Sequence, residues 1–175
     1  MNSSEFFNFL STRSSVRDYT DRPVSTETIN NILKCAQKAP SAGNREAWDV
    51  IVVTDEGIKE DLAEMAFRQE HIEKAPVILV VCANYVRSMS QYGDRGILYA
   101  LEDATIAGTY MMLAAHAAGL STCWTGAFDE EEVSAILDLP VHIRPITLLA
   151  AGYGHSPVSR TERMPLEEHL HDETW

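Results

Sequence analysis

The sequence predicts an α+β domain in which a few central strands carry helices on both faces. Three short runs rich in β-branched and other apolar residues, at 49–54, 77–82 and 143–151, are typical of buried strands. Segments with apolar residues at helical spacing lie before, between and after them. The chain has 175 residues, 45% of them hydrophobic and 23% charged, which suits a single domain over 1–175 with a polar C-terminal arm at about 155–175.

Two helices are expected before the first strand. The first is capped by Ser3 or Ser4. The second begins at Ser25 or Thr26 and ends before Pro40, because proline disfavours helix in the residue ahead of it. Each helix has an apolar stripe: Phe6, Phe9 and Leu10 in the first, and Ile29, Ile32, Leu33 and Ala36 in the second.

The middle of the chain alternates between strands and helices. The runs at 49–54 and 77–82 are continuous, so we expect both to be central strands covered on both faces. A surface helix is expected between them at 58–67. The segment 85–97 contains two glycines and predicts an excursion from the core.

The segment 98–118 is apolar nearly all round, which predicts a helix buried in a core or an interface. Gly119 suits the left-handed residue that ends such a helix. Asp129 and Glu132 form a variant of the capping box at the start of one more helix. A chain of this size has little core in which to hide a helix that is apolar all round, so we expect a dimer with this helix at or near the interface.

Charge narrows the classes of partner. The chain has 14 Lys and Arg residues against 26 Asp and Glu residues, and its formal net charge is -12, which disfavours nucleic acid and anionic membrane surfaces. Apolar runs such as Pro76–Ala83 are too short to span a bilayer, and the N-terminus does not resemble a signal peptide. Three cysteines without CxxC spacing favour free thiols in a reducing cytoplasm, without a zinc or iron–sulfur framework.

Two pairs of arginines are candidates for binding an anion. Arg13 and Arg17 flank a serine pair, and guanidinium groups match phosphate oxygens in a bidentate manner. Pairing of the two arginines with surface carboxylates explains the pentapeptide 13–17 equally well. Arg160 and Arg163 could close on the same anion if the tail folds back, although a solvated tail explains them better when taken alone.

Two loops could contact a flat ligand. The small residues of 40–48 let the backbone approach closely, although an ordinary turn is the simpler explanation. In the segment 119–128, Gly126 can expose backbone N–H groups and aromatic residues can wall a ring, unless this is a core turn. His169 and His171 lack a metal-ligand partner set, and His116 suits a core histidine. No Ser-His-Asp arrangement, dinucleotide fingerprint or Walker loop is found.

Taken together, these segments resemble the nitroreductase family of FMN-dependent oxidoreductases, in particular its small members. The resemblance runs in family order and covers most of the chain. It is carried by TRSSVRDY (12–19), APSAGNREAW (39–48), RGILYALEDATIAGTYMMLAAHAAGLSTCWTGAF (95–128), LDLP (137–140), RPITLLAAGYG (144–154) and RMPLEE (163–168). It implies a central mixed or antiparallel sheet flanked by helices, in an intertwined homodimer with two FMN sites at the interface.

The resemblance also implies roles for individual residues. Arg13 and Ser15 would hold the phosphate and ribityl end of FMN, Arg17 would lie nearer the ribityl chain and the pyrimidine edge, and the C-terminal Arg163, with Arg160, would close on the phosphate. The partner subunit would contribute a set from the loop after the second helix: Pro40, Ser41, Ala42 and Asn44. The flavin ring would face Thr125, Gly126 and Ala127, with Gln69 as a further polar contact.

The implied activity is ping-pong transfer of two electrons from NADH or NADPH through FMN to nitroaromatic, quinone or similar small acceptors. A non-catalytic flavin-binding or delivery protein and a flavin-dependent dehalogenase on the same fold are the alternatives. No residue stands out as a general acid. Three departures from the family pattern are the residues Arg45-Glu46-Ala47, the Thr125 that replaces a glutamate of some relatives, and the short 85–97 segment.

Overall fold

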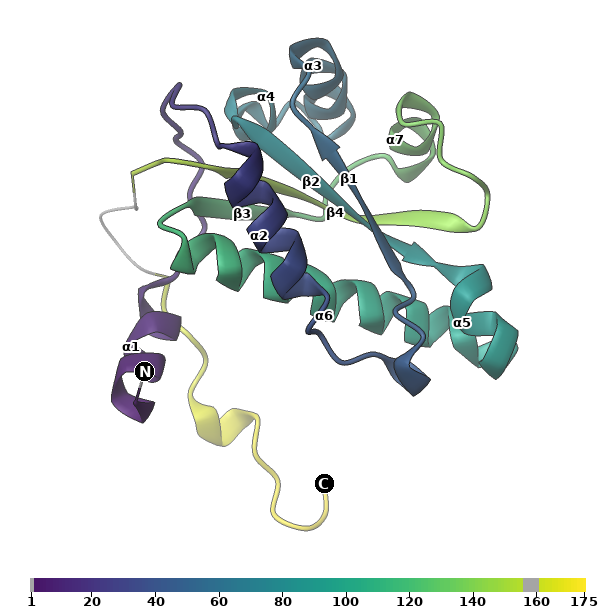
Figure 1. The fold of residues 1–175 in the computed structure, drawn as a ribbon. Helices are drawn as coiled ribbons and strands as arrows, with labels where there is room; N and C mark the ends of the chain where they lie inside the picture. Colours follow the sequence, from purple (N-terminus) through teal and green to yellow (C-terminus); the bar gives the residue numbers. More distant parts are fainter. Residues whose placement is uncertain (1, 156–160) are drawn as a thin grey trace.

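A computed structural model describes residues 2–155 and 161–175. Its centre is a four-stranded antiparallel sheet in the order β1-β2-β4-β3 (Figure 1). The strands are β1 (Trp48–Val53), β2 (Val77–Asn84), β3 (Ser121–Thr125) and β4 (Ile143–Gly152). The expected α+β architecture is confirmed, and the four strands pair antiparallel.

The two inner strands explain the continuous apolar runs. Every residue of β2 is buried, because helices cover both of its faces and it pairs with β1 and β4. The expectation of a central strand is wrong for β1, which is an edge strand with Val52 exposed. The β-branched residues of β1 favour a strand, but this preference does not distinguish an edge strand from a central strand.

One face of the sheet is covered by α2 (Thr26–Ala36) and by the long α6 (Arg95–Ala117). The core on this side includes Ile29 and Ile32 of α2 and a row of alanines on α6. Small residues let α6 approach the sheet closely: a Cβ on Gly108 would lie 2.9 Å from the Trp124 ring. Other side chains of α6 are exposed, including Ile97, Leu98 and Tyr110.

The other face is covered by α3 (Glu56–Met65), α4 (Glu70–Lys74) and α7 (Glu130–Ile136). The expected helices are present, and Asp129 caps α7 by accepting from two backbone N–H groups. Neither α4 nor β3 was predicted from the sequence. Both are only five residues long, so neither shows a full period of its pattern.

The remaining elements lie outside these two layers. α1 (Ser3–Thr12) and the C-terminal tail with η2 (Leu166–Glu168) extend away from the sheet (Figure 1). The expected cap at Ser3 or Ser4 is wrong, because Asn2 caps α1 and makes a capping box with Glu5. The predicted excursion is α5 (Tyr85–Tyr92), which packs on α6.

No helix in residues 2–155 and 161–175 has the length and apolar content needed to cross a membrane. Gly119 adopts the left-handed conformation expected of it, with φ of 76°. The end of α6 is thereby turned directly into β3.

Candidate functional site

The segment after α1 is fixed along the end of the sheet. Val16 is buried, and its N–H donates to the Thr122 carbonyl at 2.9 Å. Tyr19 forms a bridge with Gly154, and its hydroxyl donates to the Val16 carbonyl at 2.8 Å. A Cβ on Gly154 would lie 2.3 Å from the Asp18 carbonyl, so this close approach requires glycine. The segment is therefore rigid where it carries the predicted anion-binding residues.

Arg13, Ser15 and Arg17 flank this buried valine. Ser15 is half-buried beside Thr122, and Arg17 is exposed. Within the described residues, no hydrogen bond or ion pair involves any of these three side chains. Both guanidiniums lie near Cys123: burial raises the pKa of that thiol, and the positive charges of Arg17 and Arg13 partly offset the rise. The structure thus gathers two cations beside β3.

The turn that follows β3 carries a second set of predicted residues. The Gln69 amide nitrogen donates to the Ala127 carbonyl at 3.0 Å and to the Ala66 carbonyl at 2.8 Å. Gly126 and Ala127 are exposed, and their backbone N–H groups have no acceptor within the described part of the chain. Two backbone donors thus remain available to a ligand.

Thr125 differs from its two neighbours because its side chain is 3% exposed. Its hydroxyl shares a hydrogen bond of 2.8 Å with the Nε2 of His71, and its carbonyl accepts from the Thr147 hydroxyl at 3.0 Å. Burial, and then the charge of Arg17, lower the pKa of His71. Because the positive charge of Arg17 lowers the pKa of both His71 and Cys123, Arg17 lies close to the turn after β3.

The loop with Pro40, Ser41, Ala42 and Asn44 lies elsewhere. It contains η1 (Ala42–Asn44), and the buried Asp103 of α6 accepts from the N–H groups of Ala42 at 2.8 Å and Ala47 at 3.1 Å. Gly43 and Asn44 have φ near +55°, which suits a glycine and an asparagine. The departures at 45–47 leave a defined turn, because Ser41 accepts from the Glu46 N–H and Ala47 is buried.

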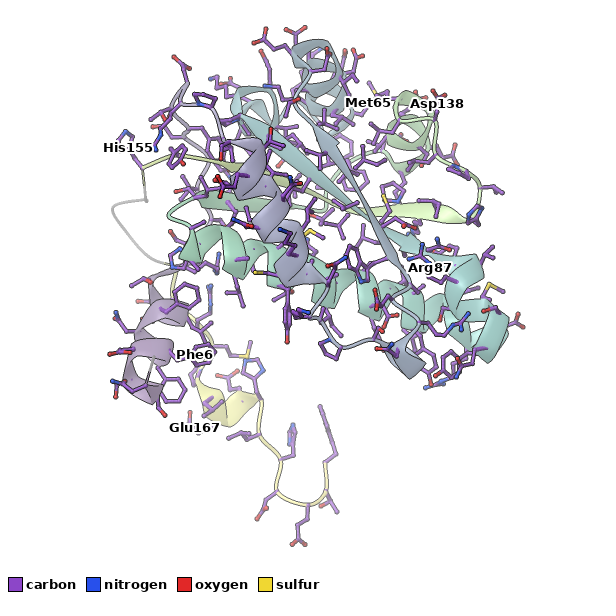
Figure 2. All side chains as sticks on the ribbon, viewed as in Figure 1. Phe6, Met65, Arg87, Asp138, His155 and Glu167 are labelled. Atoms are coloured by element: carbon purple, nitrogen blue, oxygen red, sulfur yellow. The ribbon has the colours of Figure 1, made fainter. Side chains whose placement is uncertain are left out.

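The length of α6 separates this loop from the arginines of the same chain. The loop contacts Asp103, whereas Thr12 beside Arg13 contacts His116 at 3.0 Å. Thirteen residues of helix between these contacts span about 20 Å. Figure 1 shows η1 and α1 near opposite ends of α6, and Figure 2 shows Arg87 of α5 far from His155.

The tail holds the last two predicted residues. Arg163 is exposed, and its guanidinium makes one hydrogen bond, at 3.5 Å, to the carbonyl of Glu162. The described part of the tail runs away from the sheet, with Glu167 well below it in Figure 2. Arg160 lies outside the described residues.

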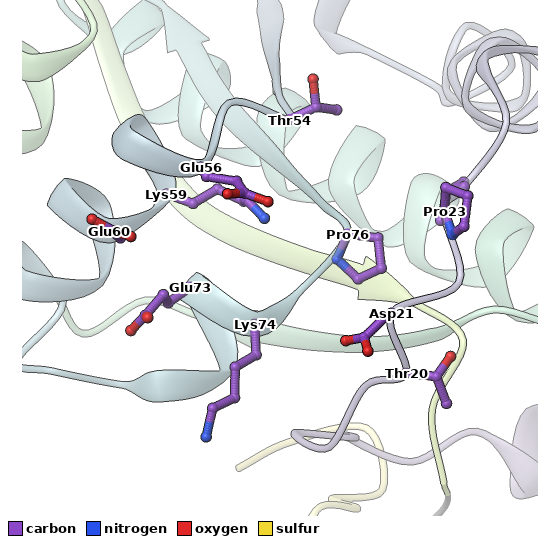
Figure 3. Close-up of a pocket in the computed structure, with 11 residues that line it drawn as sticks. Thr20, Asp21, Pro23, Thr54, Glu56, Lys59, Glu60, Glu73, Lys74 and Pro76 are labelled. Carbon is purple, nitrogen blue, oxygen red and sulfur yellow. The ribbon is translucent and has the colours of Figure 1, made fainter.

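A separate hollow of about 620 Å³ lies between α3, α4 and the 20–24 segment (Figure 3). Its lining mixes four carboxylates with two ammonium groups: Asp21, Glu56, Glu60, Glu73, Lys59 and Lys74. None of the predicted site residues lines it. The predicted site residues lie instead beside β3, in the turn after it, in the 40–44 loop and in the tail.

The model of the nitroreductase family matches residues 10–70 and 63–153. The chain belongs to the nitroreductase family. An FMN reductase (NAD(P)H) of Bacillus subtilis is 31% identical over 186 aligned positions, which cover 98% of this chain and 75% of the relative. An NADH dehydrogenase of Thermus thermophilus is 32% identical over 183 positions, which cover 89% of each chain.

Solved structures agree with this assignment. NfrA1 of B. megaterium superposes with a TM-score of 0.92 at 29% identity, covering 98% of this chain and 75% of that one. The hypothetical oxidoreductase YcnD from Bacillus subtilis superposes with a TM-score of 0.90 at 32% identity, covering 100% and 75%. The expected nitroreductase-like sheet flanked by helices is therefore confirmed.

Two residues that contact predicted site residues were not identified from the sequence: His71 beside the turn after β3, and Asp103 beside the 40–44 loop. His71 lies on α4, a helix that the sequence did not reveal, so nothing marked it as a neighbour of Thr125. Asp103 is 2% exposed on the largely apolar helix α6. A charged residue in such a position is rarely buried without a partner, and this was a signal that could have been used.

Proposed function

We propose that the chain is an FMN-dependent NAD(P)H oxidoreductase that passes two electrons to nitroaromatic, quinone or similar small acceptors. Family membership supports the enzyme class. An FMN reductase (NAD(P)H) and an oxygen-insensitive NADPH nitroreductase, of Bacillus subtilis and Salmonella typhimurium, are among the relatives.

The observation that carries the proposal is the pair of guanidiniums on the segment beside β3. Arg87 and Arg144 both pair with carboxylates in this acidic chain, at 3.0 and 2.7 Å. Arg13 and Arg17 have no such partner in the described residues, and the Ser15 hydroxyl between them is also unpartnered. This is the donor set that a phosphate monoester requires.

The rest of the neighbourhood fits FMN as well. The exposed N–H groups of Gly126 and Ala127 supply donors for a ring that becomes negatively charged on reduction. Both hydrogens of the Gln69 amide are bound to backbone carbonyls, so its Oε1 is the atom left to accept from a ligand. Donors for a phosphate thus lie beside β3, and donors and an acceptor for a polar ring lie at the turn that follows it.

The proposed site needs two copies of the chain. About 20 Å of α6 separates the contact of the loop with Pro40, Ser41, Ala42 and Asn44 from the contact of the segment that carries the arginines, which supports a contribution of this loop to the site of a partner subunit. The exposed apolar side chains of α1 and α6 support a homodimer: Phe6, Phe7, Leu10, Ile97, Leu98 and Tyr110. Arg163 of the exposed tail would join the phosphate on assembly.

Bound FMN would supply the ring that accepts hydride from NADH or NADPH and returns two electrons to the acceptor. The protein residues hold and orient: Arg13 and Arg17 bind negative charge, and the backbone donors at 126 and 127 favour charge on the reduced ring. His71 is buried and bound to Thr125, so we assign it no proton transfer. The two substrates would use one slot in turn, which is a ping-pong mechanism.

Anaerobic titration tests the proposal. Purified protein, or apoprotein reconstituted with FMN, should show flavin absorbance that bleaches on addition of NADH or NADPH and returns with a quinone. Protein that cannot bind FMN would contradict the proposal. Protein that binds FMN but is reduced by neither nicotinamide would instead be a flavin-binding module.

A further inference from the structure

The connection between α3 and α4 is attached to the turn after β3 by two side chains. Gln69 donates to the carbonyl of Ala127, and two residues later His71 shares a hydrogen bond with the Thr125 hydroxyl. The turn is thus held at both of its ends. Gly126, which lies between them, contributes no side chain that could fix its own backbone.

The contact between His71 and Thr125 is shielded from water. The two residues are 5% and 3% exposed, and the distance from Nε2 to the hydroxyl oxygen is 2.8 Å. A buried imidazole without a partner would destabilise the fold, so this hydrogen bond satisfies both groups. Burial and the nearby Arg17 lower the pKa of His71, which keeps the ring neutral.

The hydrogen bond also restricts the backbone of the turn. Threonine is β-branched and has few χ1 states, so a fixed hydroxyl fixes the orientation of its main chain. The Thr125 carbonyl is held in addition by Thr147 at 3.0 Å. The peptide groups that follow, with the unpartnered N–H groups of Gly126 and Ala127, then point in a defined direction.

We propose that His71 is a positioning residue of the cofactor site: its Nε2 holds the Thr125 hydroxyl and thereby aims the N–H groups of Gly126 and Ala127 at the flavin. The inference rests on the proposed function and deepens it. Thr125 acts here as an anchor for the turn, and the exposed backbone beside it makes the ligand contact.

Three variants test this role. H71F removes the hydrogen bond and keeps a planar ring, H71Q keeps a polar group near the position of Nε2, and T125V removes the hydroxyl in a side chain of similar shape. Each apoprotein is titrated with FMN by flavin fluorescence, and the midpoint potential of the bound flavin is measured. The potential is decisive, because a loss of packing alone would leave the donors to the reduced ring unchanged.

We expect H71F to raise the dissociation constant for FMN five- to tenfold, the scale of one lost hydrogen bond, and to make the midpoint potential more negative. H71Q should recover both values to within about twofold of the wild type. T125V should reproduce H71F, and the double variant should be no worse than either single one, because both remove the same contact. Should H71F fail to fold, T125V and H71Q provide the comparison.

Two results would overturn the inference. If the wild type binds FMN and the H71F and T125V variants bind it with unchanged affinity and potential, His71 has no positioning role and the proposed function stands. If the wild-type chain binds no FMN, the proposed function fails and this role fails with it.

Discussion

The buried carboxylate of Asp103 offers the sharpest perturbation of the loop that we assign to the partner's site. It is 2% exposed, and its two oxygens accept one backbone N–H each, from Ala42 at 2.8 Å and Ala47 at 3.1 Å. Replacement by asparagine turns one acceptor into a donor that faces an N–H. One backbone donor then loses its partner in the interior, and the other loses a charged acceptor.

The cost follows from these two bonds. A hydrogen bond to a charged group contributes about 1.5–3 kcal/mol, and a buried donor left unpaired costs about 1–3 kcal/mol. D103N should therefore lower the free energy of unfolding by about 2–4 kcal/mol. It should also weaken FMN binding at the proposed interface, because Pro40, Ser41, Ala42 and Asn44 lose their fixed position.

Urea unfolding at one fixed protein concentration measures the first effect, and flavin fluorescence measures the second. Glu102 is the matched control, since it precedes Asp103 on α6 and is exposed. E102Q should leave the free energy of unfolding within about 0.5 kcal/mol of the wild type. A D103N variant that is as stable as E102Q would show that the two hydrogen bonds accepted by Asp103 do not stabilise the fold.

Three further predictions concern the other elements of the site. R17Q should raise the dissociation constant for FMN about tenfold or more, the loss expected for a charge-assisted hydrogen bond, and an unchanged constant in a fluorescence titration would exclude Arg17 from the site. G154A should lower the midpoint of thermal unfolding, because the new Cβ would meet the Asp18 carbonyl at 2.3 Å. An unchanged midpoint would show that the segment around Asp18 does not pack closely against Gly154. The free energy of unfolding should fall as the pH falls through 6.5, the ordinary pKa of histidine, because His71 takes up a proton there in the unfolded chain but not in the fold, where its pKa is lowered. Unfolding measured at a series of pH values should show a smaller loss of stability for H71Q than for the wild type.

Much of the fold could be predicted from local patterns in the sequence. The stripe of Ile29 and Ile32, the buried run at 77–82 and the left-handed Gly119 were all predictable, because each depends on a short stretch of sequence. The edge position of β1 was not, since strand order is set by pairing between distant segments. The helical nature of 85–92 was hidden by its mixed composition, and α5 depends on packing against α6.

In the candidate site, too, the residue types were predictable from local sequence, whereas contacts between distant residues were not. The arginine pair and the turn around Gly126 were visible as residue types, and the structure brings them together through the bridge between Ser15 and Thr122. The role of His71 could not be foreseen, because its contact with Thr125 joins residues 54 positions apart. The distance of the 40–44 loop from the arginines emerges only from the length of α6.

The claim that one FMN site is assembled from two chains can be tested by subunit complementation. A variant that lacks the phosphate-binding charges, R13Q with R17Q, is coexpressed under a second affinity tag with a loop variant, D103N. Each homodimer should bind FMN weakly, because both of its sites carry one defect. In the mixed dimer, one site combines the intact arginines with the intact loop, and the other site carries both defects. We expect about half a molecule of FMN per chain in the doubly purified mixed dimer. A mixed dimer with no more FMN than either parent would contradict it.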